Sequence, residues 1–379
     1  MFNAFGKLWL KGAKRLAKAQ VAQQKKLTKK ISKKVVKALV AAPAQKPRAE
    51  PRVVKQRAKV GRSGSRTAVT RTAGTWTRSI QASAPGVTPV RRLSYWLYLP
   101  PPALAADAVP AMPVKPLPLV VMLHGCEQTA PEFAAGTRMN ELAARHGFAV
   151  LYPQQSLKAH PQRCWPWYKR SVQHGGDEVI LIAGMVEKII ARHAVDRGRV
   201  YVAGLSAGAA LAQTLALRHP HLIAAVASHS GPAFGLADSR MQAFAVMQHG
   251  GYHVVPPIQA LLADSPGFPG MPVLILQGQQ DPVVRPVNAA QLVRQFCAVN
   301  AMPETAHAAP VNRAARGACD AYRVTDYKRG SKTMVRLCEV ANLAHAWSGG
   351  DPAQRYNTAS GPDASKLAWD FFKRHRRAI

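Results

Sequence analysis

A serine between two glycines marks the point where strand-forming residues give way to small helix formers. Residues 201–211 read YVAGLSAGAAL, and Ser206 is the centre of a G-x-S-x-G pattern. The pattern is typical of a strained turn that projects the serine hydroxyl above a sheet, with glycines that let strand and helix approach closely. It predicts that Ser206 is a nucleophile. A tight strand-to-helix corner that needs a small residue is the alternative.

A serine hydroxyl is a weak nucleophile, so this chemistry also needs a base and a residue that orients the base. On folds with this turn the chain order is Ser, then Asp or Glu, then His. Asp281 follows an apolar run in LILQGQQDPVV, and His345 lies in the glycine-flanked loop of EVANLAHAWSGG. We expect Asp281 to orient the base and His345 to be the base. Helix capping and loop hydrogen bonding are their alternative roles.

Other histidines and acids fit this order less well. His229 ends the next apolar segment, where a structural or pocket-lining role is expected, and both His249 and His253 precede the candidate acid. Asp320 and Asp326 follow the acid but lie in a polar stretch, which predicts solvated surface carboxylates.

The tetrahedral intermediate of acyl transfer needs hydrogen-bond donors for its oxyanion. The first donor is commonly the amide after the nucleophile, here that of Ala207, and the second comes from a loop after an early strand. The segment LPLVVMLHGCEQT ends such a strand, so we expect the amide of Cys126 to be the second donor, with Glu127 as a further candidate. His124 is expected to brace this loop rather than to act as a base.

Strands and helices alternate around these residues, and several strands are near-continuous apolar runs, as in parallel sheets covered by helices on both faces. We therefore expect an α/β domain with a doubly wound, mostly parallel sheet over residues 81–379. Residues 231–270 interrupt the alternation, either as a cap over the site or as a surface excursion. The predicted strands are 94–100, 117–125, 147–153, 199–204, 222–231, 271–278 and 333–340, and the predicted helices are 132–147, 177–193 and one from 207.

Five segments together resemble a known family. In chain order they are LHGCEQTAPEFAAGTRMNELAARHGFAVLYPQQ, CWPWY, VDRGRVYVAGLSAGAAL, GQQDPVVRPVNA and HAWSGG. With them the chain resembles the esterase family of poly(3-hydroxybutyrate) depolymerases, which is similar to feruloyl and acetylxylan esterases. The resemblance implies an α/β-hydrolase fold, the same Ser, Asp and His, and an oxyanion hole built by the HGC stretch. It also implies a disulfide between Cys126 and Cys164, which suits an oxidising compartment.

The resemblance implies a polyester or small-ester substrate, cleaved through an acyl-enzyme. Trp165, Trp167 and Trp347 are candidates to line a groove for an aliphatic polyester, Trp347 first among them, and the alternative is that they pack long loops. A feruloyl- or acetylxylan-type carboxylesterase is the alternative activity. The alternative from another class is a granule- or nucleic-acid-binding protein with an inactive hydrolase scaffold.

The amino-terminal part of the chain is unusually basic. The 379 residues carry a formal net charge of +33, and residues 1–80 hold 22 of the 52 Lys and Arg but one acid, Glu50. FNAFGKLWLKGAKRLAKAQ fits a basic amphipathic helix, and the whole segment is expected to be a partly helical or disordered extension. Three roles stay open: contact with a granule coat or anionic lipid, binding of nucleic acid, or none beyond solvation.

Further expectations concern location and ligands. No run of eighteen apolar residues and no secretory signal occur, so we expect no transmembrane segment and favour a cytoplasmic, granule-associated protein; an extracellular one is the alternative that the family implies. The chemistry needs neither metal nor cofactor, and no motif indicates one. The five cysteines fit neither a zinc pattern nor a dense disulfide framework: Cys126, Cys164, Cys297, Cys319 and Cys338.

Overall fold

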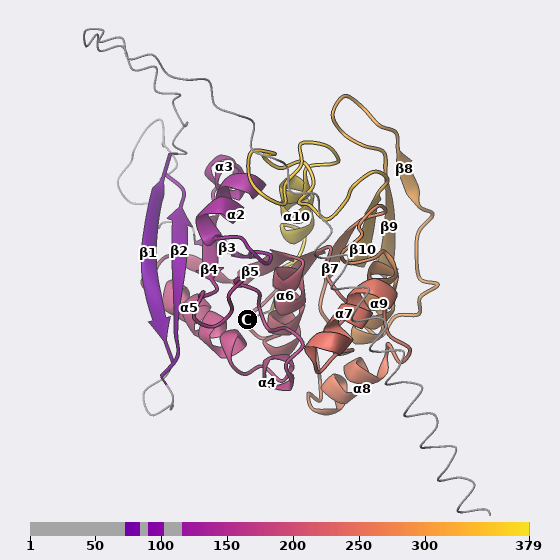
Figure 1. Ribbon diagram of the computed structural model, residues 1–379, viewed down its shortest axis with the longest axis horizontal. Coiled ribbons are helices and arrows are strands. Elements are labelled where there is room, and N and C mark those ends of the chain that lie inside the picture. Colours follow the sequence, from indigo (N-terminus) through magenta and orange to yellow (C-terminus); the bar gives the residue numbers. More distant parts are fainter. Residues whose placement is uncertain (1–72, 84–89, 102–115, 379) are drawn as a thin grey trace, which may run out of the picture. The chain divides into compact units, whose positions relative to one another are not determined.

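The computed structural model describes residues 73–83, 90–101 and 116–378 (Figure 1). Within them lies a ten-stranded sheet in the order β1-β2-β4-β3-β5-β6-β7-β10-β9-β8. The expected amphipathic helix near the amino terminus lies outside the described residues. The strands are β1 (Thr75–Ala82), β2 (Arg92–Leu99), β3 (Leu117–Leu123), β4 (Ala149–Gln154), β5 (Val195–Leu205), β6 (Ala225–His229), β7 (Val273–Gly278), β8 (Val311–Arg313), β9 (Tyr322–Arg329) and β10 (Lys332–Val340).

The centre of the sheet is parallel and both of its sides are antiparallel. Strands β4, β3, β5, β6, β7 and β10 run in one direction. Strands β1 and β2 continue the sheet on one side, and β9 and β8 on the other, all with antiparallel pairing. Because parallel strands end at the same edge, the loops after β3, β5, β7 and β10 meet there.

Helices cover both faces, as the apolar strands predict. Helices α5, α6, α8 and α9 pack into one core with the sheet, and α2, α3 and α10 pack into a second core on the other face. None of the described helices is long and apolar enough to cross a bilayer. The helices are α2 (Ala130–Thr137), α3 (Met139–His146), α4 (Arg170–Gln173), α5 (Glu178–Arg192), α6 (Ala207–Arg218), α7 (Arg240–His249), α8 (Pro256–Ala263), α9 (Val287–Val299) and α10 (Ala364–Phe372).

This order of strands, with a sharp turn between β5 and α6, is the expected α/β-hydrolase fold. The structure differs from the sequence-based expectation at two places. The single helix expected over 132–147 is two helices, because Arg138 adopts a left-handed conformation with φ 53° between α2 and α3. The boundary expected at residue 80 falls inside β1, which pairs with β2 along its whole length.

The polar stretch after α9 also differs from expectation. It forms the antiparallel strands β8 and β9, and Asp326 on β9 accepts two hydrogen bonds from Arg336 on β10 at 2.6 and 2.7 Å. Asp326 is therefore a partly buried cross-strand partner and not a solvated surface carboxylate.

The segment expected to interrupt the alternation lies between β6 and β7 and contains α7 and α8 (Figure 1). The side chains of Ala243 and Val246 on α7, and of Ile258 and Leu261 on α8, are buried in the core shared with α9. This packing fixes α7 beside the carboxyl-terminal edge of the sheet, where it contributes to the candidate site.

Candidate active site

Ser206 lies on a strained turn between β5 and α6. Its φ is 58° and its ψ is −120°, and its amide donates to the carbonyl of His229 at 2.9 Å. A Cβ on Gly204 would lie 2.3 Å from the carbonyl oxygen of Gly208, and a Cβ on Gly208 would lie 2.1 Å from that of Leu123. Both glycines are thus required for the close approach of helix and strand, and a serine held at positive φ is a feature typical of functional sites.

Asp281 and His345 are joined by a short hydrogen bond. Nδ1 of His345 lies 2.8 Å from Oδ2 of Asp281, and Oδ1 accepts from the amides of Val283 and Val284, both at 2.9 Å. Burial alone would raise the pKa of Asp281, but the hydrogen bond from His345 and the two amides outweigh it and leave that pKa below its ordinary value. The ionised carboxylate is therefore the stable form, and it accepts the Nδ1 proton of His345.

Neighbouring strands bring these two residues together. Asp281 follows β7 and His345 follows β10, and the two strands pair in parallel up to Gly278. A Cβ on Gly278 would lie 2.1 Å from the carbonyl oxygen of Leu343, while the amide of Gln280 donates to that same oxygen at 3.1 Å. Gly278 is a positioning residue that the sequence analysis missed, although a glycine at the end of an apolar run is a signal for close backbone approach.

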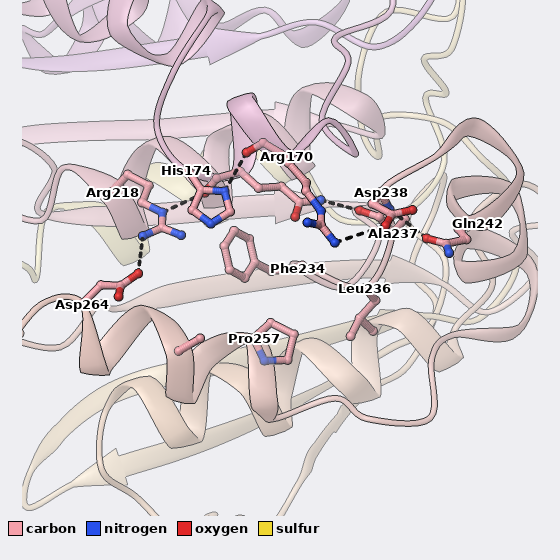
Figure 2. Close-up of a pocket in the computed structure, with 13 residues that line it drawn as sticks. Arg170, His174, Arg218, Phe234, Leu236, Ala237, Asp238, Gln242, Pro257 and Asp264 are labelled. Atoms are coloured by element: carbon pink, nitrogen blue, oxygen red, sulfur yellow. Dashed lines mark hydrogen bonds and ion pairs between the residues drawn. The ribbon is translucent and has the colours of Figure 1, made fainter.

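Helix α7 contributes side chains to two pockets, and the larger one is not the candidate site. That pocket, of about 420 Å³, is crossed by the pairs Arg170–Asp238 at 3.6 Å and Arg218–Asp264 at 3.9 Å (Figure 2). Its charged groups are thus directed at one another. None of the residues predicted for the site lines it.

The second pocket is a cleft of about 300 Å³ beside Ser206. It lies between α7, the turn at the start of α6 and the segment 160–168. Trp165 and Trp167, two of the candidates for a substrate groove, line it, but both are nearly buried. The lining residues are Cys126, His160, Pro161, Gln162, Cys164, Trp165, Trp167, Tyr168, Ser206, Ala207, Arg240, Ala243 and Met247.

Two backbone amides at this cleft are free to bind an oxyanion. Cys126 and Ala207 both line it with Ser206, and within the described residues their amides have no acceptor. The amide of Glu127, the further candidate, donates to the carbonyl of Gln162 at 2.6 Å and so turns away from this role.

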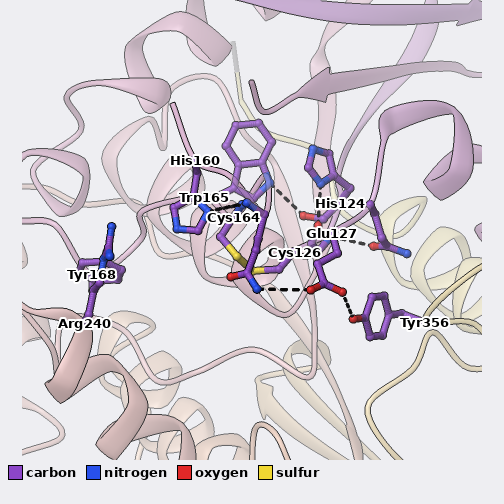
Figure 3. The surroundings of a disulfide bond; sticks show 12 residues. His124, Cys126, Glu127, His160, Cys164, Trp165, Tyr168, Arg240 and Tyr356 are labelled. Carbon is purple, nitrogen blue, oxygen red and sulfur yellow. Dashed lines mark hydrogen bonds between the residues drawn. A yellow bond between two sulfur atoms is a disulfide. The ribbon is translucent and has the colours of Figure 1, made fainter. Parts of the chain in front are cut away.

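The loop that carries the Cys126 amide is held on two sides. A disulfide joins Cys126 to Cys164 on the wall of the cleft (Figure 3). On the other side, the Glu127 carboxylate accepts from the hydroxyl of Tyr356 at 2.6 Å and from Arg355 at 3.0 Å. Glu127 itself has a φ of 63°, so a strained residue directly follows the proposed donor.

His124 holds the same loop through hydrogen bonds of both ring nitrogens. Its Nδ1 lies 2.7 Å from the carbonyl oxygen of Gly125, and its Nε2 accepts from the amide of Gln155 at 3.1 Å. Burial lowers the pKa of His124 to about 4, which keeps the ring neutral and able to do both. These bonds fit the bracing role expected of it.

His229 connects the turn at Ser206 to the loop of His345. Its carbonyl accepts the Ser206 amide, and its ring Nε2 accepts from the amide of Ser348 at 3.2 Å. Burial, followed by the positive charge that His345 can carry, lowers the pKa of His229 to about 3, so the ring is a neutral acceptor. The sequence placed His229 near the site but gave no sign of this link. His249 and His253 are exposed.

Trp347 is a core residue, so the expectation that it contacts substrate is wrong. Its side chain is 1% exposed, it stacks on His229 at 5.1 Å between ring centres, and its Nε1 donates to Ser365 at 3.2 Å. Phe133 meets its ring edge to face. In this loop His345 turns towards Asp281, while the indole of Trp347 is buried in the core.

One contact of the expected site is not formed. Within the described residues, no hydrogen bond joins the Ser206 hydroxyl to His345, whose ring is bonded to Asp281. Such bonds are often long before substrate binds.

The described residues contain no cluster of three or more His, Cys, Asp or Glu suited to a metal ion.

Comparisons with known proteins support one family. Residues 93–318 match the family model described as esterase PHB depolymerase. The chain is 34% identical over 194 residues to poly(3-hydroxyalkanoate) depolymerase C of Paucimonas lemoignei, a match that covers 50% of this chain and 46% of that protein. It is 28% identical over 191 residues to probable acetylxylan esterase A of Aspergillus clavatus, covering 48% of this chain and 61% of that protein.

A third relative is feruloyl esterase B of Neurospora crassa, 36% identical over 117 residues, which are 30% of this chain and 39% of that protein. The chain thus spans about half the length of the relatives it matches. Among solved structures, the acetyl xylan esterase from Aspergillus awamori superimposes with a TM-score of 0.60 at 20% identity, over 78% of this chain and 99% of that one. This likeness is one of fold.

Proposed function

The chain belongs to the esterase family of PHB depolymerases, and on that premise we propose that it is a serine esterase with Ser206 as nucleophile, His345 as base and Asp281 as the residue that orients the base. The observation that carries this proposal is the 2.8 Å bond between His345 Nδ1 and Asp281 Oδ2, at the same sheet edge as the strained Ser206.

The proposed reaction follows from this arrangement. Because Asp281 holds the Nδ1 proton of His345, Nε2 is left to take the proton of the Ser206 hydroxyl as the oxygen attacks the ester carbonyl. The oxyanion then accepts from the amides of Cys126 and Ala207. His345 returns the proton to the leaving alcohol, and water activated by the same ring hydrolyses the acyl-enzyme and releases the acid.

Replacement of the nucleophile tests the activity. Ser206→Ala should lower kcat on p-nitrophenyl butyrate by several orders of magnitude, because the three residues act as a unit. Ser265→Ala, a serine outside the cleft, is the matched control and should keep full activity. Activity of the Ser206 variant within about tenfold of the wild type would contradict the proposal.

We propose poly(3-hydroxybutyrate), or related short-chain polyhydroxyalkanoates and their oligomers, as the substrate. Large apolar side chains are exposed on the segments that line the cleft: Met241 is 77% exposed and Phe244 62% on α7, and Tyr252 follows that helix. Val283 and Val287 are exposed nearby, since the amide of Arg285 between them donates to the carbonyl of Met247 on α7 at 2.9 Å. Clustered exposed apolar groups favour an aliphatic, water-insoluble substrate over a hydrated sugar.

The alternative substrate is a feruloyl or acetyl ester of a plant polysaccharide. The sequence similarity to probable acetylxylan esterase A and to feruloyl esterase B supports it. The chemistry of acyl transfer does not choose between acyl groups, because pocket shape sets that choice.

A substrate panel distinguishes a polyester substrate from a plant polysaccharide ester. Purified protein is compared on amorphous poly(3-hydroxybutyrate), its oligomers, methyl ferulate and acetylated xylan. The double variant Met241→Ser/Phe244→Ser should lose activity on the polymer suspension but keep that on soluble p-nitrophenyl butyrate. Equal loss on both substrates would show that these side chains do not select the polymer, and turnover of the sugar esters alone would favour the alternative substrate.

We propose that the basic segment 1–80 binds a granule coat or another anionic surface, including nucleic acid. Its charge supports this role. Deletion of residues 1–72 should abolish retention on polymer granules or DNA and leave hydrolysis of soluble esters intact. Unchanged retention after the deletion would contradict this role, and loss of retention together with no ester hydrolysis by the full chain would favour the alternative of a binding protein with an inactive scaffold.

A further inference from the structure

A basic pocket lies at the end of the sheet opposite to Ser206. It has a volume of about 380 Å³ and is formed by the turn between β9 and β10, by β10 itself and by the segment that ends α10. Since β10 runs from Lys332 towards the loop of His345, this pocket and the candidate active site are at opposite ends of the strand. The polar residues that line it are Ser331, Lys332, Thr333, Arg336, Arg374 and His375.

Two of the three cations that line the pocket have no carboxylate partner among the described residues. The guanidinium of Arg336 is held by Asp326 at 2.6 Å. Lys332 and Arg374 form no ion pair within the described part of the chain. The other nearby acid, Asp370, is paired with Lys373 at 2.6 Å outside the pocket. Two cations of the pocket are therefore available to a ligand.

His375 supplies a second, independent observation. Its side chain is 2% exposed, and its Nδ1 has no hydrogen-bond partner among the residues that the structure describes. A buried polar atom without a partner is rare and costs free energy, so it indicates a group that a ligand or ion completes. Burial, followed by the charges on Lys332, Arg336 and Arg374, lowers the pKa of His375 to about 4, which means that all three cations act on this ring.

We propose that this pocket binds a phosphate-class oxyanion. Lys332 and Arg374 neutralise its charge, the hydroxyl of Ser331 donates to its oxygens, and Nδ1 of His375 gains a partner, while the Thr333 hydroxyl stays bonded to Asp326. A phosphate group carries about 1.5 to 2 negative charges at pH 7, which matches two unpaired cations. Its tetrahedral oxygens also suit donors that come from a turn, a strand and a helix end. Free phosphate and the headgroup of an anionic phospholipid share this chemistry.

The test uses the full chain and inorganic phosphate. Binding is measured by calorimetry at constant ionic strength, for the protein and for two double variants. Lys332→Gln/Arg374→Gln removes the pocket cations, whereas Lys328→Gln/Arg313→Gln removes the same charge from exposed residues that do not line the pocket. We expect the pocket variant to bind at least about tenfold more weakly, since hydrogen bonds to charged groups are among the strongest. The control variant should bind as the wild type does.

Two further readouts complete the test. On addition of phosphate, but not of sodium chloride, the side-chain nitrogen resonances of His375 should move towards those of the protonated ring. Equal phosphate affinity in the two double variants, or an unchanged His375, would overturn the proposal. Calorimetry with soluble dihexanoyl phosphatidic acid, which avoids a vesicle surface that segment 1–80 could bind, then identifies the source: binding that is tighter than that of phosphate and is lost in the pocket variant alone indicates a lipid headgroup, and binding no tighter than that of phosphate indicates free phosphate.

Ester hydrolysis provides an independent check. The pocket lies away from the cleft, so the pocket variant should hydrolyse p-nitrophenyl butyrate at the wild-type rate. Failure of phosphate binding would thus leave the proposed esterase function intact. Equally, absence of ester hydrolysis would leave the proposed phosphate site intact.

Discussion

His345 and Asp281 lie 2.8 Å apart through Nδ1 and Oδ2, although 64 residues separate them in the chain. The parallel pairing of β7 with β10 and the lack of a side chain at Gly278 make this approach sterically feasible. In the proposed mechanism this bond sets which ring nitrogen carries the proton, and thereby leaves Nε2 as the acceptor at the edge of the sheet where Ser206 lies.

Asp281→Asn tests this orientation. An amide can present its NH₂ group to Nδ1 and favour the wrong tautomer, so we expect kcat on p-nitrophenyl butyrate to fall by about 10⁴ with little change in KM. Asp370→Asn, at a carboxylate on α10 that pairs with Lys373 and does not line the cleft, is the control. A loss below about tenfold would show that Asp281 does not orient the base.

The lowered pKa of Asp281 also predicts how stability depends on pH. A carboxyl group whose pKa is lower in the folded than in the unfolded protein stabilises the fold above its unfolded pKa, and this contribution disappears as pH falls through the folded pKa. The wild type should therefore lose more free energy of unfolding than Asp281→Asn as pH falls from about 6 to below the ordinary Asp pKa of 3.8. Urea denaturation at several pH values measures this difference, and parallel curves would contradict it.

His229 should act as a positioning residue for the loop of His345. His229→Phe keeps an aromatic ring on Trp347 but removes the acceptor of the Ser348 amide, so we expect a loss of roughly 1–3 kcal/mol in the free energy of unfolding. We also expect kcat to fall with KM nearly constant. His229→Gln offers a new acceptor and should recover part of kcat; no difference between the two variants would mean that His229 only fills space.

The disulfide should stabilise the protein and hold the Cys126 amide at the cleft. Cys126→Ser/Cys164→Ser removes a link across 38 residues, for which a loss of roughly 2–4 kcal/mol is typical. We expect kcat to fall as well, by less than the roughly 10² to 10³ seen when an oxyanion donor is removed. Cys319→Ser, at a free thiol, is the control. Full activity in the double variant would show that the disulfide does not hold the Cys126 amide in position.

Much of this arrangement could be predicted from the sequence, because its signals are local. The G-x-S-x-G pattern between an apolar run and small helix formers identifies the turn at Ser206, and apolar runs identify the parallel strands. The break between α2 and α3 depends on one residue in a left-handed conformation, which no periodicity reveals. The burial of Trp347 and the link through His229 depend on contacts between distant segments, and so does the pairing of Asp326 with Arg336.

The most direct test of the central claim is covalent trapping of the nucleophile. The protein is treated with diethyl p-nitrophenyl phosphate, a reagent that phosphorylates activated serines, and the modified peptide is identified by mass spectrometry. The proposed mechanism predicts one label per chain, on Ser206, with loss of esterase activity in proportion to labelling and little labelling of His345→Gln. Labelling of another residue, or full activity after labelling of Ser206, would contradict it.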